Sequence, residues 1–295
     1  IMIKSFLDKN NIDAHFDESM KKHTTFKVGG NAMCIAMPDS IEKTAKLIEF
    51  LKNNNIESYY LGNGSNVIFN DNGFSGVIIK SLNLNNINID GTTVKVGAGM
   101  LMTSLSKAVR EKGLSGLEFC YGIPGNVGGG VFMNAGAYGG EISNKLVCVE
   151  YIDENGVLKT INKAECEFSY RHSIFMKNKW FIVSATFDLE EKDPAEMFAF
   201  MEDIMQRRKD KQPLDKPSAG SAFKRPTGGY AAALIDQAGL KGYQVGGAAI
   251  STKHAGFAVN LGGATAADVQ ELLRQVSDQV FESTGIRLEP EVRIW

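Results

Sequence analysis

The sequence lacks any uninterrupted apolar run near the ~20 residues that a membrane-spanning helix needs, and it opens with no signal-peptide pattern. Its four cysteines (Cys34, Cys120, Cys148 and Cys166) form no Cys-x-x-Cys pair and have no histidine at ligand spacing, which argues against zinc, iron–sulfur clusters and a disulfide framework. Neither charge sign predominates, because 32 Lys and Arg stand against 34 Asp and Glu. We therefore expect a soluble, cytoplasmic protein with buried thiols and no metal, nucleic-acid or membrane partner.

A composition of 43% hydrophobic and 22% charged residues is ordinary for a globular protein, and 295 residues favour two or three domains. Apolar spacing predicts a helix over Ile41–Asn53, capped by Ser40, between short strands. Residues 92–189 are strand-rich. Helices near Tyr230–Ala238 and Thr265–Ser283 frame a second, smaller α/β unit. The pattern is that of an α+β protein.

A first glycine loop, Leu61-Gly-Asn-Gly-Ser-Asn-Val67, lies between two apolar strands. Alternating glycines let backbone N–H groups turn inward to bind phosphate oxygens. The loop is neither a Walker motif nor the Rossmann fingerprint, because no Gly-Lys-Ser/Thr follows and Val67 occupies the third glycine position. An ordinary tight turn and an anion site both fit it.

A second and longer glycine-rich stretch, Gly113–Gly140, has no obvious regular structure, and stretches of this kind are more often functional than idle. Each ordered glycine costs roughly 0.5–1 kcal/mol relative to alanine, so we expect something large and flat to approach this backbone closely. Interleaved apolar residues such as Ile123, Val127 and Val131 indicate that the stretch packs and is not a disordered linker.

Apolar and polar residues alternate strictly over residues 286–294. This pattern would place Arg287, Glu289, Glu291 and Arg293 on one face of a strand that Pro290 confines to an edge or interrupts.

Taken singly, polar residues in such settings have structural explanations. An arginine beside a tyrosine is usually a surface ion-pair residue, a serine after glycine is usually a turn residue, and a glutamate in an alternating strand usually faces water.

Several motifs taken together resemble the UDP-N-acetylenolpyruvoylglucosamine reductase family. They occur in order from about residue 20 to the C-terminus, and they are Thr25-Phe-Lys-Val-Gly-Gly30, the Gly62–Asn66 loop, Gly122-Ile-Pro-Gly125 with Asn134-Ala-Gly136, Tyr170-Arg171, Ala219-Gly-Ser-Ala-Phe-Lys224 and Leu288-Glu-Pro-Glu-Val-Arg293. Any one of them could be chance, but the ordered set is highly specific. The chain is similar to the family's shorter second type, which lacks an inserted loop carrying a substrate-binding tyrosine.

The resemblance implies a two-lobed FAD-binding domain of the vanillyl-alcohol-oxidase type followed by a smaller α/β substrate domain. The lobes would be residues 1–82 and 83–193, the substrate domain residues 194–285, and residues 286–295 a strand returning to the FAD region. It also implies an oxidoreductase with noncovalent FAD and with NADPH as co-substrate. That enzyme would reduce the enolpyruvyl ether of a UDP-sugar to UDP-N-acetylmuramate, in the peptidoglycan synthesis on which cell shape and division depend.

The resemblance carries three catalytic roles over to this sequence. Arg171 would hold the substrate carboxylate as negative charge grows, Glu291 would assist in its protonated form, and Ser221 would donate the proton that quenches the intermediate. Residues expected at FAD are Gly62, Asn63, Gly64, Ser65, Asn66, Gly122, Ile123, Pro124, Gly125, Gly128, Asn134, Ala135 and Gly136. Residues expected at the UDP-sugar are Tyr170, Lys211, Arg225 and Tyr230, the two cations being placed for the diphosphate because they flank the Ser221 loop.

Two other functions fit parts of the pattern. A flavin oxidase of the same fold would pass its electrons to oxygen and leave Ser221, Arg171 and Glu291 without a role, and slow reoxidation in air would argue against it. A non-catalytic nucleotide-binding module would use the glycine loops only to hold a ligand, and it would be colourless when pure. We expect a monomer that acts on small molecules.

Overall fold

The computed structural model describes residues 2–295, which form two compact units, each assembled from separate stretches of chain. The first unit comprises the chain up to Phe16, Met33–Asn63 and Ser75–Gln206. The second comprises Asp17–Ala32, Gly64–Phe74 and Arg207–Trp295. Among the described residues, no helix is long and apolar enough to cross a membrane. The domain boundaries inferred from the sequence stay predictions.

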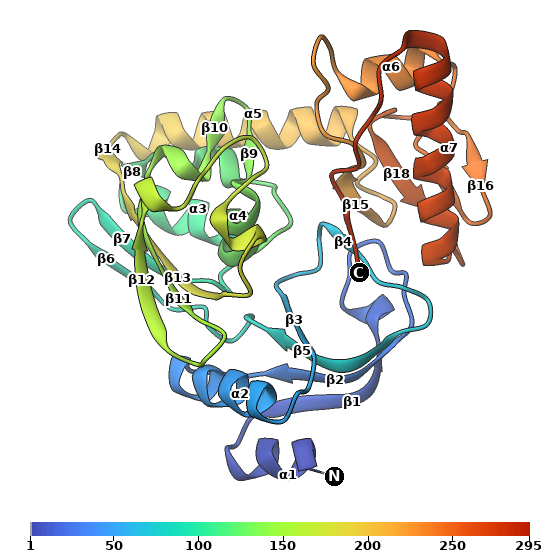
Figure 1. Ribbon diagram of the computed structural model, residues 1–295. Helices are drawn as coiled ribbons and strands as arrows, with labels where there is room; N and C mark the ends of the chain where they lie inside the picture. The colour runs from blue at the N-terminus through green and yellow to red at the C-terminus, as the bar shows by residue number, and fades with distance from the viewer. Residues whose placement is uncertain (1) are drawn as a thin grey trace. The chain divides into compact units, whose positions relative to one another are not determined.

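One sheet of the first unit has the strand order β1-β2-β5-β3 and packs against two helices, drawn in blue in Figure 1. The prediction for the second helix is confirmed, since it runs from Ile41 to Asn53 and the Ser40 Oγ accepts a hydrogen bond of 3.2 Å from the Lys43 N–H. Its buried face includes Leu47 and Leu51. The elements are α1 (Met2–Lys9), β1 (Asp13–Ser19), β2 (Asn31–Met37), α2 (Ile41–Asn53), β3 (Ser58–Leu61) and β5 (Phe74–Lys80).

A second sheet of the first unit is antiparallel, with the order β12-β11-β13-β7-β6. Its side chains and those of two helices form one buried core. The elements are β6 (Ile87–Asp90), β7 (Thr93–Gly97), α3 (Met102–Glu111), α4 (Val127–Met133), β11 (Leu146–Ile152), β12 (Leu158–Asn162) and β13 (Phe181–Asp188). The first unit also contains two separate two-stranded sheets. One pairs β8 (Leu114–Ser115) with β14 (Glu190–Glu191), and the other pairs β9 (Gly136–Ala137) with β10 (Gly140–Glu141).

The glycine-rich stretch is more ordered than the sequence suggests. The expectation that Gly113–Gly140 lacks regular structure is wrong, because this stretch contains α4 and the β9–β10 hairpin. Glycine has a low helix propensity, but close tertiary packing requires residues without a side chain at positions of this helix. A Cβ on Gly130 would lie 2.8 Å from the Met102 sulfur, and one on Gly128 would lie 3.0 Å from the Ala98 Cβ. Close packing of the helix therefore requires part of the glycine content.

The second unit contains an antiparallel sheet of order β15-β18-β17-β16, and α6 and α7 contribute to its core. The elements are β15 (Ser218–Ser221), α6 (Ala231–Gln237), β16 (Gln244–Val245), β17 (Ala248–Ile250), β18 (Phe257–Asn260) and α7 (Ala266–Thr284). A capping box at Thr265 starts α7, and Gly285 ends it at a φ of 73°. The helix α5 (Pro194–Lys211) joins the units along the chain, and the Asp193 carboxylate accepts a 2.9 Å hydrogen bond at its start.

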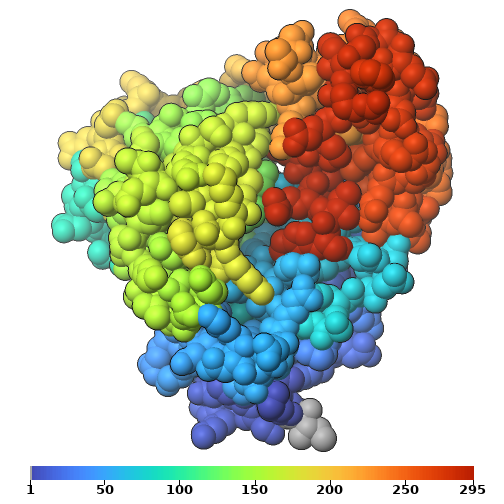
Figure 2. Space-filling view, in the orientation of Figure 1, coloured from blue at the N-terminus to red at the C-terminus, as the bar shows by residue number. Residues whose placement is uncertain are grey.

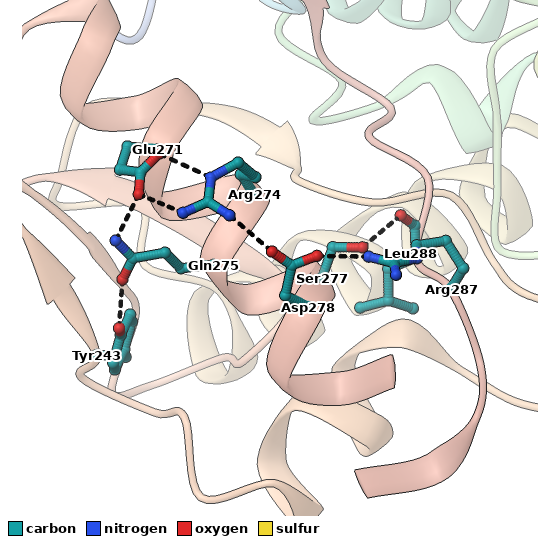
Figure 3. A network of polar contacts seen from close by, with 8 residues as sticks. All are labelled: Tyr243, Glu271, Arg274, Gln275, Ser277, Asp278, Arg287 and Leu288. Atoms are coloured by element: carbon teal, nitrogen blue, oxygen red, sulfur yellow. Dashed lines mark hydrogen bonds and ion pairs between the residues drawn. The ribbon is translucent and has the colours of Figure 1, made fainter. Parts of the chain in front are cut away.

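The C-terminal segment turns back from α7 along a polar network (Figure 3). The Ser277 hydroxyl donates to the carbonyl of Leu288 at 2.9 Å, and Arg287 forms an ion pair with Asp278. The segment, red in Figure 2, lies at the surface of this unit on the side in view. It ends in β19 (Arg293–Ile294), which pairs in parallel with β4 (Val67–Ile68).

The expected alternating strand over residues 286–294 is interrupted, as Pro290 predicted. The segment forms an isolated bridge between Phe223 and Pro290 and regular pairing only from Arg293. Proline lacks the N–H group that a continuous ladder would require.

Candidate active site

Ser221 is the last residue of β15 and is exposed to solvent. The strand pairs with β18 through Ser218 and Val259, and then through Ser221 and Phe257, with a shift in register between the two pairs. Gly220 lies within the shift at a φ of +74°, a conformation that glycine adopts without strain. The bulge thus determines the direction in which the serine hydroxyl leaves the sheet.

The backbone of Glu291 is held next to Ala222, the residue that follows this serine. The Glu291 N–H donates to the carbonyl of Ala222 at 2.9 Å, and its own carbonyl accepts a hydrogen bond of 3.3 Å from the Asn66 amide. Glu289 instead forms an ion pair with Lys224. Within the second unit, Glu291 therefore contacts the residue that follows Ser221, whereas the side chain of Glu289 pairs with Lys224.

The end of the first glycine loop is tied to the same strand. Gly64 has a φ of +65°, and a Cβ at this position would lie 2.1 Å from the carbonyl oxygen of His23. The Thr25 N–H donates to the Gly64 carbonyl at 3.0 Å, while the Thr25 hydroxyl donates to the Ser218 carbonyl at 2.6 Å. Thr25 thus joins the loop to β15. No local pattern in the sequence predicted this role for Thr25, although the residue opens the Thr25-Phe-Lys-Val-Gly-Gly30 motif.

In the first unit, Tyr170 and Arg171 form the tip of a tight turn between Ser169 and His172. Arg171 has a φ of +52°, and its Nη2 donates to the carbonyl of Gly136 at 3.2 Å. Its guanidinium carbon lies 4.9 Å from the centre of the Tyr170 ring, which is a cation–π distance. The turn presents a half-exposed tyrosine and an oriented guanidinium together.

The second glycine segment contacts the first part of the Gly62–Asn66 loop. The Asn63 amide donates to the Pro124 carbonyl at 2.6 Å, and the Gly122 N–H donates to the Thr103 hydroxyl at 3.0 Å. A Cβ on Gly62 would lie 2.8 Å from the Asn126 Oδ1. Both glycine segments thus meet within the first unit, through Gly62 and Asn63.

These segments have features that suit FAD. The buried Asn126 Oδ1 has no hydrogen-bond partner, and buried polar atoms are rarely left unpaired without a reason. A Cβ on Gly129 would meet nothing within 4 Å, so one face of α4 stays open although Gly128 and Gly130 are packed. An open glycine face beside an unpaired carbonyl fits a flat cofactor with polar edges. The individual FAD contacts stay predictions.

The two cationic residues predicted to bind the diphosphate, Lys211 and Arg225, lie in the second unit. The guanidinium carbon of Arg225 stands 4.5 Å from the centre of the Tyr230 ring, so these two predicted residues form one cation–π pair. Burial lowers the pKa of His254, and the charges of Lys241 and Lys211 lower it further. Lys211 is therefore close enough to His254 to act on it electrostatically.

The predicted site residues divide between the units. The second holds Ser221, Glu291, Gly64, Ser65, Asn66, Lys211, Arg225 and Tyr230. The first holds Arg171, Tyr170, Gly62, Asn63, Gly122, Ile123, Pro124, Gly125, Gly128, Asn134, Ala135 and Gly136. Within each unit the structure joins residues that are far apart in sequence.

Cysteine and lysine side chains are the other candidates for reactive groups. The cysteines are unpaired, and burial raises the pKa of Cys34 and Cys166 to about 12, so these thiols are poor nucleophiles. Burial lowers the pKa of Lys80, at the end of β5, to about 8. Within residues 2–295, no group of three or more His, Cys, Asp and Glu side chains is placed to hold a metal ion.

The fold and the glycine segments define an FAD-dependent oxidoreductase. Residues 32–162 match the family model described as an FAD binding domain. A berberine bridge enzyme variant, a reticuline dehydrogenase, superposes with a TM-score of 0.50 at 18% identity over 64% of this chain and 43% of its own, which shows the fold alone. The predicted fold class, α+β with a two-lobed FAD-binding domain of the vanillyl-alcohol-oxidase type and a smaller α/β domain, is confirmed.

More specific matches cover nearly the whole chain. Residues 212–295 match the model of the UDP-N-acetylenolpyruvoylglucosamine reductase C-terminal domain. The reductases of that name from Clostridium novyi and Clostridium beijerinckii are 45% and 44% identical, over 99% and 95% of this chain and 94% and 92% of theirs. The crystal structure of the Thermus caldophilus reductase superposes with a TM-score of 0.82 at 35% identity, covering 96% of this chain and 98% of that one. The chain belongs to the UDP-N-acetylenolpyruvoylglucosamine reductase family.

Proposed function

We propose that this chain reduces UDP-N-acetyl-3-O-(1-carboxyvinyl)-glucosamine to UDP-N-acetylmuramate with electrons from NADPH, in the cytoplasmic part of peptidoglycan synthesis. The observation that carries the proposal is the backbone hydrogen bond between Glu291 and Ala222, because it joins the segment that carries the predicted carboxylic acid to the residue after the predicted proton donor, Ser221. Family membership supports the substrate class. Free cysteines accord with a reducing compartment.

When bound, FAD would accept a hydride from NADPH and deliver one to the terminal methylene carbon of the enolpyruvyl group. Negative charge then develops on the neighbouring carbon and its carboxylate. Arg171 would hold that carboxylate through charge-assisted hydrogen bonds that strengthen as the charge grows. The Tyr170–Arg171 turn favours this role because it orients the guanidinium through the Gly136 carbonyl.

The carbon next to the carboxylate must finally receive a proton. Ser221 would donate it, because a carbanion-like intermediate is a strong enough base to take the proton of a hydroxyl. Glu291 would act beside it in its protonated form, since an ionised carboxylate next to an enolate would be repulsive. Lys211 and Arg225 would hold the diphosphate, and Tyr230 would share that site through its pairing with Arg225.

Two half-reactions test the proposal on the purified protein. Denaturation should release flavin, and anaerobic NADPH should bleach its visible absorbance. Adding the enolpyruvyl UDP-sugar should then restore the absorbance, with one UDP-N-acetylmuramate formed per flavin as measured by mass spectrometry. A colourless protein would argue for a nucleotide-binding module. Fast reoxidation by air, without reoxidation by the UDP-sugar, would argue for a flavin oxidase.

A further inference from the structure

The turn that carries Arg171 is conformationally demanding. Ser169 and His172 close it through reciprocal backbone hydrogen bonds of 3.2 and 3.1 Å. Arg171 adopts a φ of +52° at its tip, a backbone conformation that is strained for a residue with a Cβ. A turn of this kind keeps its geometry only when the surrounding structure holds it.

A buried asparagine holds the base of the turn. The side chain of Asn134 donates from Nδ2 to the Ser169 carbonyl at 3.1 Å and accepts at Oδ1 from the Ser143 N–H at 3.0 Å. Asn134 is only 1% exposed and ends α4 at a φ of 44°, which asparagine tolerates well. Both ends of its amide are therefore occupied by backbone groups of the first unit.

Two further contacts fasten the turn to the same short segment. The guanidinium of Arg171 donates to the Gly136 carbonyl at 3.2 Å, and the fully buried Ser173 donates from its hydroxyl to the Phe132 carbonyl at 2.7 Å. Asn134 lies midway between Phe132 and Gly136 in the chain. The position of the guanidinium thus depends on residues 132–136, which comprise the end of α4 and the residues after it.

We propose that Asn134 is a positioning residue that sets the guanidinium of Arg171 for the substrate carboxylate by fixing the Tyr170–Arg171 turn to the 132–136 segment. This inference rests on the role of Arg171 in the proposed function. Bidentate recognition of a carboxylate requires an oriented guanidinium, and a displacement of about 1 Å can cost ~10²-fold in rate. Any contact of Asn134 with FAD would then come from its backbone, since the side-chain amide serves the turn.

Asn134→Gly tests this because glycine keeps the left-handed backbone and removes both side-chain hydrogen bonds. We expect FAD content and the rate of flavin reduction by NADPH to stay within about twofold of wild type. Reoxidation by the enolpyruvyl UDP-sugar should slow by roughly 10- to 100-fold. The matched control is Asn178→Ala. It removes a similar hydrogen bond of 3.1 Å, from the Asn178 side-chain amide to the Ile174 carbonyl, and should leave both rates unchanged. Loss of NADPH reduction in Asn134→Gly would overturn the proposal.

A double-mutant cycle separates positioning from general structural damage. In an Arg171→Ala background, Asn134→Gly should slow reoxidation by less than about threefold, because its effect passes through the missing guanidinium. Full additivity of the two losses would overturn the role of Asn134. If Arg171→Ala alone left reoxidation unchanged, the role of Arg171 in the proposed function would fail instead. Amide hydrogen exchange over residues 169–173 should also accelerate in Asn134→Gly but not in Asn178→Ala.

Asn134→Asp supplies a chemical rescue. An ionised aspartate can still accept from Ser143 but cannot donate to Ser169, whereas the protonated acid can. Burial raises the pKa of a carboxyl group, so the reoxidation rate of this variant should recover as the pH falls. The ionisable side chains of Glu141, Glu167 and His172 lie near the turn and are present in every variant, so the rates are divided by those of Asn134→Gly at each pH. A ratio that is independent of pH would overturn the donor role.

Discussion

The backbone N–H of Glu291 donates a hydrogen bond of 2.9 Å to the carbonyl of Ala222, the residue after Ser221. Almost seventy positions of sequence separate the two partners, and the return of the C-terminal segment from α7 brings them together. The same segment carries Glu289 to Lys224. Substitution of each of these two glutamates has a different expected effect.

Glu291→Gln should keep most of the activity and Glu291→Ala should not, because a protonated glutamate and a glutamine are both neutral hydrogen-bond donors. Removing such a donor costs about 10²-fold in kcat. Steady-state kinetics with the UDP-sugar measure both variants. Equal losses for Gln and Ala would show that the ionised carboxylate is required.

Glu289→Gln is the matched control on the same segment. It removes the ion pair between Glu289 and Lys224. The Glu289 side chain is largely exposed, and exposed ion pairs contribute ~0–1 kcal/mol to the free energy of unfolding. We expect unchanged kcat and a thermal midpoint within about 2 °C of wild type. A loss of kcat as large as that of Glu291→Ala would exchange the roles of the two glutamates.

Two adjacent glycines of α4 should respond differently to the same substitution. Gly129→Val places a side chain in open space, so the protein should fold with near-wild-type stability but bind little FAD. Gly130→Val drives a side chain into Met102, and overpacking of this kind costs ~1–3 kcal/mol of stability. Flavin absorbance per protein and thermal unfolding measure the two effects. Full flavin occupancy in Gly129→Val would place the cofactor away from this face.

The turn after β17 makes stability depend on pH. The Nδ1 of His254 accepts from the Gly256 N–H at 3.0 Å, and the Gly256 carbonyl accepts from the Ala222 N–H at 2.8 Å. Burial lowers the pKa of His254, a backbone hydrogen bond partly opposes this effect, and the charges of Lys241 and Lys211 lower the pKa further. Because the folded pKa lies below the ordinary value of about 6.5, this stability is present above pH 6.5 and is lost as the pH falls through the folded pKa.

His254→Asn keeps an acceptor without a charge, so its thermal midpoint should fall less between pH 7 and pH 5 than that of wild type. The exposed His15→Asn should retain the wild-type dependence. Carboxyl groups with lowered pKa values, such as Asp268, contribute only at more acidic pH. Identical pH profiles for His254→Asn and wild type would remove His254 as the cause.

Local signals in the sequence predicted the elements that local interactions determine. Ser40 predicted the start of α2, and the helix expected near Thr265–Ser283 is α7, Ala266–Thr284. The helix α4 was not predicted, because glycine disfavours helix formation locally. Packing of Gly128 against Ala98 and of Gly130 against Met102 explains why glycines occur in this helix. For the same reason, pattern alone could not find the bond from Thr25 to Ser218, which spans 193 positions. The site motifs were recognisable, whereas the contacts that orient them were not.

Ser221 gives the sharpest test, because the two half-reactions place different demands on it. Reduction of FAD by NADPH is a hydride transfer that needs no proton at the substrate carbon, so Ser221→Ala should bleach at the wild-type rate. Completing the second half-reaction requires an acid at that carbon, and reoxidation by the enolpyruvyl UDP-sugar should slow by ~10²–10⁴-fold. Ser221→Cys keeps a proton on a side chain of similar size and should recover part of the loss.

Stopped-flow absorbance follows each half-reaction separately. Ser283→Ala is the matched control, because Ser283 lies in the last turn of α7 and its hydroxyl donates to the Val280 carbonyl of the same helix at 3.1 Å. This control should leave both rates near wild type. Equal slowing of the two half-reactions in Ser221→Ala would mean that the serine positions the flavin or the nicotinamide and does not donate the proton.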